Sequence, residues 1–241
     1  MTTFDPAAFT ASKAKPLPVV LLLDTSGSMH GEKIASLNDA VRRMVGTFTK
    51  EESQANEFLV SIVTFGGTTG LLVPPTAASD LAFQDLSAGG PTPLGEAIRA
   101  AKALIEDKEQ TPSRAYRPLV VLVSDGVPTD AWEGALGDFV GSGRSAKCDR
   151  MALGIGREAC DGNGRETLDK FIAGTEHRVF EAKDAEEISK FFNFVTMSVV
   201  SRSLSLDPNT VPKDATLQPP IVSSSALADA PTTATQEDSY W

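Results

Sequence analysis

Runs of consecutive apolar residues alternate along the chain with stretches in which apolar residues recur every three or four positions. The continuous runs are typical of strands that are buried on both faces of a sheet. Together, the continuous runs and the spacing of three or four residues predict strands and helices in alternation. The predicted strands cover residues 18–23, 58–65, 119–123, 151–155 and 177–180, and residues 69–73 form a hairpin partner after the Gly66-Gly67 turn.

Helical spacing is clearest where residues such as Leu37, Val41 and Met44 follow one another at intervals of three and four. The predicted helices cover residues 34–48, 94–105, 130–143 (the weakest pattern), 166–173 and 188–199. A strand–helix alternation of this kind predicts an α/β fold, with a doubly wound, Rossmann-like and mostly parallel sheet and helices on both of its faces.

The two ends of the chain differ from the part between them. Residues 1–15 show neither period and are interpreted as a flexible leader, whereas residues 16–203 form the predicted domain. Residues 204–241 are acidic and rich in Pro, Ser and Thr, and their apolar residues recur at neither the strand period of 2 residues nor the helix period of 3.6 residues. Because such a segment buries too little apolar surface to offset its ordering entropy, we predict a disordered tail.

The charge of the chain limits its partners. With 32 Asp and Glu against 22 Lys and Arg, the formal net charge is −10. A binder of duplex nucleic acid needs a basic face, and so does a protein that adsorbs to an anionic membrane. No apolar run approaches the roughly 20 residues that a membrane-spanning helix needs. We expect neither nucleic acid nor a membrane as a partner.

Cysteine and histidine are too scarce for the commonest structural and metal scaffolds. Cys148 and Cys160 are too few for a disulfide framework and fit no zinc spacing, and His30 and His177 are the two histidines. The run at 18–23 is too short for a signal-peptide core. We therefore expect reduced cysteines and a cytoplasmic location.

Oxygen-bearing residues follow three of the predicted strands and loops. Asp24, Ser26 and Ser28 come directly after the first strand, Thr92 precedes the helix at 94–105, and Asp125 follows the strand at 119–123. In a doubly wound sheet, ligands bind beyond the carboxyl ends of the strands, at the switch point of the topology. Carboxylate and hydroxyl oxygens are hard ligands, so the pattern predicts a divalent cation. Mg²⁺ is the first choice, with Mn²⁺ or Ca²⁺ as alternatives, since Ca²⁺ prefers more carboxylates.

Each of these residues also has an ordinary explanation when it is taken alone. Asp24 could end a strand, Thr92 could cap a helix before Pro93, and Asp125 could form a turn with Gly126. Asp130 is interpreted as a helix cap, and the Asp161-Gly162-Asn163-Gly164 stretch as a loop that lacks the remaining calcium ligands. The joint occurrence at three predicted strand ends is what favours a metal site.

The same residues resemble a known family. The stretch DTSGS at 24–28, followed by Thr92 and Asp125, is similar to the metal-ion-dependent adhesion site of von Willebrand factor A domains, over about residues 16–200. The resemblance implies that Ser26, Ser28 and Thr92 are direct or near-direct ligands. It also implies that Asp24 and Asp125 bind the ion directly or through water, and that an Asp or Glu of a partner protein completes the coordination.

A finer likeness points to the bacterial TerY/YegL-like branch that is linked to tellurite resistance and stress. It is carried by the stretches at 17–29, 89–98, 122–130 and 191–199. The resemblance implies protein kinases or phosphatases as partners. The expected function is thus a metal-dependent protein-interaction module without enzymatic activity.

Two alternatives remain open. One is a metal-assisted hydrolase or phosphatase. Ser26 argues against it, because an aspartyl-phosphate enzyme of the haloacid-dehalogenase type needs a second Asp at this position. The other is a scaffold regulated by its own acidic tail, with Asp229, Glu237 or Asp238 reaching back to the ion. A flexible tail of about 35 residues spans roughly 30–35 Å, which is long enough for this.

Overall fold

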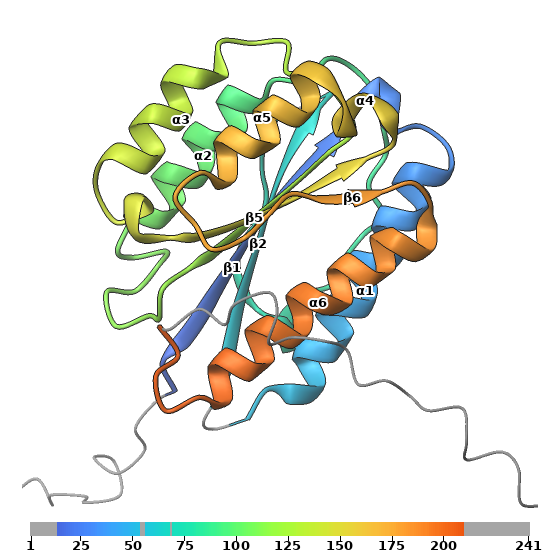
Figure 1. The fold of residues 1–241 in the computed structure, drawn as a ribbon. Coiled ribbons are helices and arrows are strands. Elements are labelled where there is room, and N and C mark those ends of the chain that lie inside the picture. The colour runs from blue at the N-terminus through green and yellow to red at the C-terminus, as the bar shows by residue number, and fades with distance from the viewer. Residues whose placement is uncertain (1–13, 54–55, 68, 210–241) are drawn as a thin grey trace, which may run out of the picture.

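The computed structural model describes residues 14–53, 56–67 and 69–209, and within them six strands form one sheet in the order β3-β2-β1-β4-β5-β6 (Figure 1). The strands are β1 (Pro16–Thr25), β2 (Glu57–Gly66), β3 (Gly70–Ala77), β4 (Leu119–Ser124), β5 (Asp149–Ile155) and β6 (Phe180–Ala182). All neighbours pair in parallel except β2 and β3, which are antiparallel. The predicted mostly parallel, doubly wound sheet is confirmed.

Helices cover both faces of this sheet (Figure 1). They are α1 (Glu32–Glu51), α2 (Leu94–Glu106), α3 (Trp132–Gly141), α4 (Arg157–Cys160), α5 (Gly162–Ile172) and α6 (Ala185–Leu204), with short 3₁₀ turns η2 (Gly27–Met29), η3 (Ala78–Asp80) and η4 (Ser145–Lys147). The apolar faces of α1 and α6 pack on one side of the sheet, and those of α2, α3 and α5 pack on the other. None of the described helices is long and apolar enough to cross a membrane.

The central strand β1 explains why its sequence is apolar without interruption. Leu21 and Leu23 contribute to the core under α1 and α6, whereas Val20 and Leu22 contribute to the core under α2. Successive side chains of a strand point to opposite faces, so a strand between two helical layers needs apolar residues at every position. β1 is therefore fixed at the centre of the fold, and its carboxyl end lies at the middle of the sheet edge.

The prediction for the last strand is wrong. It was placed at residues 177–180, whereas β6 runs from Phe180 to Ala182 and pairs with β5. His177 instead lies buried outside the sheet, with its Nε2 at 3.0 Å from Asp149 Oδ2. The predicted strand therefore overlaps a buried connection that precedes β6.

The start of α5 and the end of β3 also differ from the prediction. Residues 161–164 were expected to form a loop, but α5 already begins at Gly162, directly after the short helix α4. Strand β3 continues past residue 73 to Ala77 and includes Pro74 and Pro75. Prolines are tolerated there because β3 is an edge strand, and its pairing with β2 shifts register nearby.

The described chain continues beyond the expected domain boundary at residue 203. Arg202, on the last turn of α6, donates from Nε to the carbonyl of Pro208, and the backbone N–H of Arg117 donates to the side chain of Asn209. Residues up to Asn209 therefore pack on the domain. The rest of the predicted tail, like most of the predicted leader, lies outside the described residues.

Candidate metal centre

The candidate centre lies where the direction of winding changes. β1 has β2 on one side and β4 on the other, so the connections that leave β1 and β4 diverge at the carboxyl end of these two strands. Asp24 belongs to the end of β1, and Asp125 directly follows β4. This is the switch point at which doubly wound sheets bind ligands.

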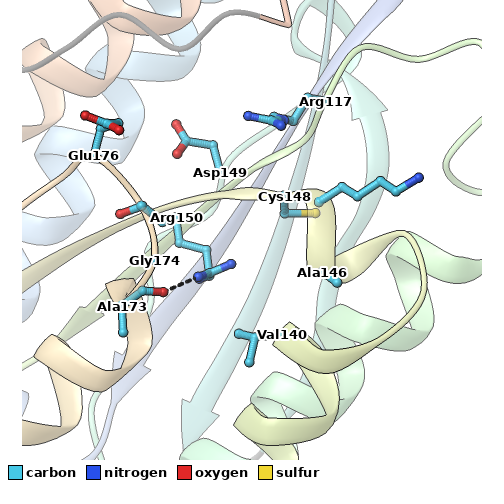
Figure 2. Close-up of a pocket in the computed structure, with 11 residues that line it drawn as sticks. Arg117, Val140, Ala146, Cys148, Asp149, Arg150, Ala173, Gly174 and Glu176 are labelled. Atoms are coloured by element: carbon cyan, nitrogen blue, oxygen red, sulfur yellow. Dashed lines mark hydrogen bonds between the residues drawn. The ribbon is translucent and has the colours of Figure 1, made fainter.

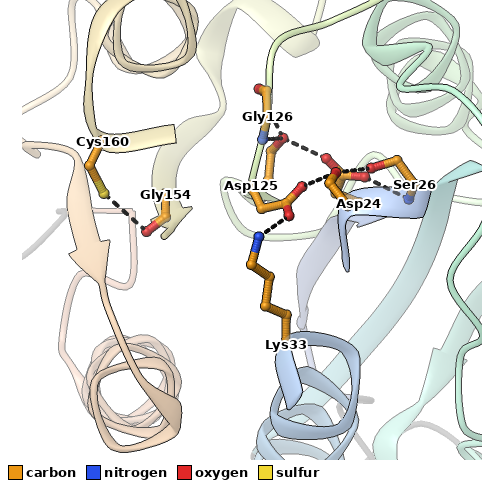
Figure 3. A network of polar contacts seen from close by, with 9 residues as sticks. Asp24, Ser26, Lys33, Asp125, Gly126, Gly154 and Cys160 are labelled. Carbon is orange, nitrogen blue, oxygen red and sulfur yellow. Dashed lines mark hydrogen bonds and ion pairs between the residues drawn. The ribbon is translucent and has the colours of Figure 1, made fainter. Parts of the chain in front are cut away.

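Hydrogen bonds join four of the five predicted residues (Figure 3). The Ser26 backbone N–H donates to Asp24 Oδ1 at 2.8 Å, and Ser28 Oγ donates to Asp125 Oδ1 at 2.7 Å. The Ser26 and Ser28 hydroxyl oxygens lie 3.0 Å apart. Since a hydroxyl has one proton and Ser28 gives its own to Asp125, Ser26 is the donor in this pair. Both serine oxygens therefore keep lone pairs that a cation can use.

Asp24 is fully buried, and its second oxygen accepts a hydrogen bond from Ser124 Oγ at 2.6 Å. Burial raises the pKa of the Asp24 carboxyl above its ordinary value, and the neighbouring charge of Asp125 raises it further. The hydrogen bonds from Ser124 and Ser26 act in the opposite direction. Ser124 was not singled out from the sequence, although it lies beside Asp125 at the strand end.

Thr92 differs from the other four predicted residues, because no hydrogen bond joins its side chain to them in the described structure. Its side chain is buried, and its hydroxyl forms no hydrogen bond to another described residue. Thr129 holds its backbone on two sides, because Thr129 Oγ1 accepts from the Thr92 N–H at 3.0 Å and the Thr129 N–H donates to the Thr92 carbonyl at 2.9 Å. Thr92 therefore does not cap α2, and its hydroxyl is available to a ligand.

Asp130 performs the capping instead. Its carboxylate oxygens accept hydrogen bonds from the backbone N–H groups of Gly95 and Glu96, at 3.0 and 3.1 Å. The predicted capping role of Asp130 agrees with these contacts, but the helix that it caps is α2 and not α3, which follows it in the sequence. Thr129 and Asp130 together tie the β4–α3 loop to the start of α2.

Glycine backbones bring the remaining loops together. The Gly27 N–H donates to the Gly90 carbonyl, and the Gly89 N–H donates to the Thr25 carbonyl. Gly90 has a φ of 77°, and a Cβ atom there would lie 2.6 Å from Gly67 Cα. Only glycine satisfies both demands without displacement. The loop that carries Thr92 is thus held against the loop that carries Ser26.

A lysine that the sequence patterns did not reveal completes the centre. Lys33, in the first turn of α1, forms an ion pair with Asp125 Oδ2, and Figure 3 shows its side chain rising from the helix to that carboxylate. A Cβ atom at Gly156 would lie 3.5 Å from Lys33 Cε, so the lysine also passes the carboxyl end of β5. The only sequence signal for Lys33 is its position five residues after Ser28.

The donor set fits a small hard cation. Hydrogen bonds join two carboxylates and two hydroxyls, and backbone contacts hold the loop of Thr92 against the loop of Ser26. Every one of these side-chain donors is oxygen, as Mg²⁺ and Mn²⁺ prefer. Among the described residues no group of three or more His, Cys, Asp and Glu gathers at one place. A site for a softer ion such as zinc with nitrogen and sulfur ligands is therefore not found in this part of the chain.

Two hollows lie outside the cluster. One, of about 480 Å³, lies beyond β5 and β6 and is lined by Gly156, Cys160 and Glu181 among others. Cys160 ends α4 and is half-buried, and its thiol donates to the Gly154 carbonyl at 3.8 Å (Figure 3). The hollow therefore lies next to the ion pair of Lys33 without containing the predicted ligands.

The second hollow, of about 510 Å³, lies at the opposite end of the sheet (Figure 2). Arg150 donates there to the carbonyls of Phe171 and Ala173, which end α5, and Asp149 is engaged with His177. Cys148 is buried beside them, which raises the pKa of its thiol to about 12. These groups stabilise the fold rather than forming a reactive cluster.

Comparison with known proteins agrees with this architecture. An uncharacterized protein of Mycobacterium tuberculosis, Rv2850c, is 32% identical over 148 residues, which are 59% of this chain and 22% of that protein. A von Willebrand factor type A structure from Catenulispora acidiphila superimposes with a TM-score of 0.59 at 18% identity, over 77% of this chain and 42% of the other. The chain thus spans less than half of the length of each of these two proteins.

A further similar structure is proximal thread matrix protein 1 from the mussel byssus, described with a zinc-occupied adhesion-site motif. Its TM-score is 0.56 at 16% identity, over 78% of this chain and 48% of the other. At this identity the likeness concerns the fold. The von Willebrand factor type A domain family itself matches residues 19–194, a range that includes all five predicted ligands. The chain belongs to the von Willebrand factor type A domain family.

Proposed function

We propose that this chain is a metal-dependent protein-interaction module. A divalent cation, preferably Mg²⁺, is held by Asp24, Ser26, Ser28, Thr92 and Asp125. The observation that carries the proposal is the chain of hydrogen bonds from Ser26 through Ser28 to Asp125. It turns the protons toward the carboxylate and leaves hydroxyl lone pairs for a cation. Mn²⁺ or Ca²⁺ is the alternative ion.

A carboxylate of the partner completes the coordination. The protein supplies few charged ligands, and Ser28 is exposed at the outer side of the cluster. With both aspartates ionised, a divalent ion and the Lys33 ammonium would give the cluster a net positive charge, which favours an acidic group from outside. The partner is therefore proposed to present an Asp or Glu side chain.

Binding rather than catalysis is the proposed role. Both carboxylates of the cluster are already engaged, Asp24 by Ser26 and Ser124, and Asp125 by Ser28 and Lys33. Neither is therefore placed to act as a general base on a bound water. A metal-assisted hydrolase remains testable as Mg²⁺-dependent hydrolysis of a phosphate ester such as p-nitrophenyl phosphate, which this proposal expects to be absent.

The biological setting is proposed from the sequence resemblance alone. The likeness to the tellurite-resistance branch suggests a stress-response system with a protein kinase or phosphatase as the partner. Both cysteines are free thiols, which supports a reducing compartment such as the cytoplasm. Growth of a deletion strain on tellurite, with and without the wild-type gene, tests this setting.

The partner is tested by affinity capture from the native cytosol, with Mg²⁺ and with EDTA. Wild type is compared with Asp125→Ala and with Asp138→Ala, which removes an exposed carboxylate from α3. A partner should be retained by wild type and by Asp138→Ala in Mg²⁺, and lost in EDTA and with Asp125→Ala. Retention that is indifferent to both EDTA and Asp125→Ala would contradict the proposed function.

A further inference from the structure

Among the described residues, Lys33 is the only cationic side chain that the structure places on a carboxylate of the cluster. Asp125 is fully buried, whereas the Lys33 side chain is 37% exposed. The carboxylate thus depends on a partly solvated ammonium at one oxygen and on the Ser28 hydroxyl at the other. A buried carboxylate without such a partner would be strongly destabilising.

The ion pair between Lys33 and Asp125 changes the net charge of the cluster that a metal ion would meet. Asp24 and Asp125 contribute two negative charges when ionised, and Lys33 offsets one of them. A divalent ion on the same carboxylates would lie close to the ammonium, and like charges repel over such distances even in a solvated environment. The ammonium and the metal ion therefore make opposing demands on Asp125.

We infer that Lys33 is a built-in competitor of the metal ion, which balances Asp125 when no metal is bound and weakens the binding of a divalent cation. The inference rests on the proposed function, because it assumes that Asp125 is a metal ligand. It adds a regulatory residue from outside the predicted ligand set. The metal affinity of the chain is then set by α1 as well as by the three ligand loops.

The test uses the metal alone as a probe. Mg²⁺ and Mn²⁺ are titrated by calorimetry into the wild-type chain and into Lys33→Met and Lys33→Gln. Lys33→Met removes the charge with little change in length, and Lys33→Gln keeps an N–H donor for Asp125, so that at least one variant retains the fold. Lys50→Met is the matched control, because Lys50 is exposed at the other end of the same helix.

Both Lys33 variants should bind Mg²⁺ about tenfold more tightly than wild type, whereas Lys50→Met should bind like wild type. In EDTA, Lys33→Met should unfold at a lower temperature than Lys50→Met, and Mg²⁺ should restore its stability. Unchanged or weaker Mg²⁺ binding by both Lys33 variants would overturn the role of Lys33 alone. Absence of Mg²⁺ binding in wild type and in both variants would overturn the metal site as well.

Discussion

At the amino end of β5, buried charged side chains are paired with backbone carbonyls or with a histidine side chain. At the carboxyl ends of β1 and β4, by contrast, two buried carboxylates are linked to one another by hydrogen bonds through two serine residues. Arg150 donates to two carbonyls at the end of α5, and Asp149 contacts His177. Asp24 and Asp125 are equally buried, but one lysine is the only cation on them within the described chain. We propose that the buried charge at the first end stabilises the fold, whereas the buried charge at the second end forms a metal site.

The difference predicts that substitutions at the two ends have opposite signatures. At the carboxyl ends, a substitution should remove metal binding and leave the fold largely intact. At the amino ends, it should lower the free energy of unfolding and leave metal binding intact.

The largest effect is expected for Asp125→Asn. The substitution removes a charged ligand but keeps the shape of the side chain, and Lys33 can turn toward solvent because it is partly exposed. Mg²⁺ affinity should fall at least about 100-fold, equivalent to about 2.7 kcal/mol. Calorimetric titration measures it, with Asp138→Asn as the control. Mg²⁺ affinity within a factor of three of wild type would remove Asp125 from the ligand set.

The next effect is expected for Arg202→Met at the other end of the molecule. Arg202 is fully buried, and it donates to the carbonyls of Pro208 and Arg117. Both carbonyls would lose their donor, so the free energy of unfolding should fall by about 2.5 kcal/mol. Urea unfolding measures the change. If this variant also lost Mg²⁺ binding while folded, the proposed separation between the two ends would be wrong.

Gly90→Ala should produce a smaller effect that concerns the site and the fold together. The added Cβ meets the Gly67 backbone at a positive φ, so the loop before Thr92 must shift. We expect a loss of about 2 kcal/mol in unfolding free energy and weaker Mg²⁺ binding.

The control for this variant is Gly162→Ala. Gly162 also has a positive φ, of 58°, but nothing lies within 4 Å of its added Cβ. This control should be destabilised less than Gly90→Ala and should bind Mg²⁺ normally. Equal metal affinity in the two variants would show that the contact between Gly90 and Gly67 does not position the ligands.

The smallest effect concerns the two thiols, one near each end of β5. Burial raises the pKa of the Cys148 thiol to about 12 and also raises that of Cys160, which is only half-buried. A raised thiol pKa means that the reactive thiolate is scarce at pH 8. Iodoacetamide at pH 8 should therefore modify Cys160 slowly and Cys148 only on unfolding. Faster labelling of Cys148 than of Cys160, measured by mass spectrometry, would contradict the burial.

The sequence was sufficient for the architecture because apolar runs and helical spacing report burial directly. β1 and β4 are apolar throughout since both of their faces are covered, and this placed Asp24 and Asp125 at the correct edge. The order of the strands then brought those two ends together. The prediction was wrong where burial had another cause. At residues 177–180, His177 is buried by its contact with Asp149 and not by strand pairing.

The supporting residues of the site could not be predicted in the same way. Lys33 and Ser124 are recognisable only from contacts across the fold, because a lysine in a first helical turn and a serine at a strand end are common in any sequence. The capping role of Asp130 was predicted, but the helix that it caps was not. Capping of α2 from a later loop depends on how the two loops pack, which the sequence does not show. Short-range patterns therefore identified the candidate ligands better than the residues that hold them.

The metal site itself is tested most directly by diffraction from crystals that contain Mn²⁺, recorded near the manganese absorption edge. We predict one anomalous peak per chain, within coordination distance of oxygens from Asp24 or Asp125 together with Ser26, Ser28 and Thr92. Excess Mg²⁺ in the same crystals should abolish the peak. A fully ordered loop cluster without a peak, or a peak bound only elsewhere on the chain, would contradict the account.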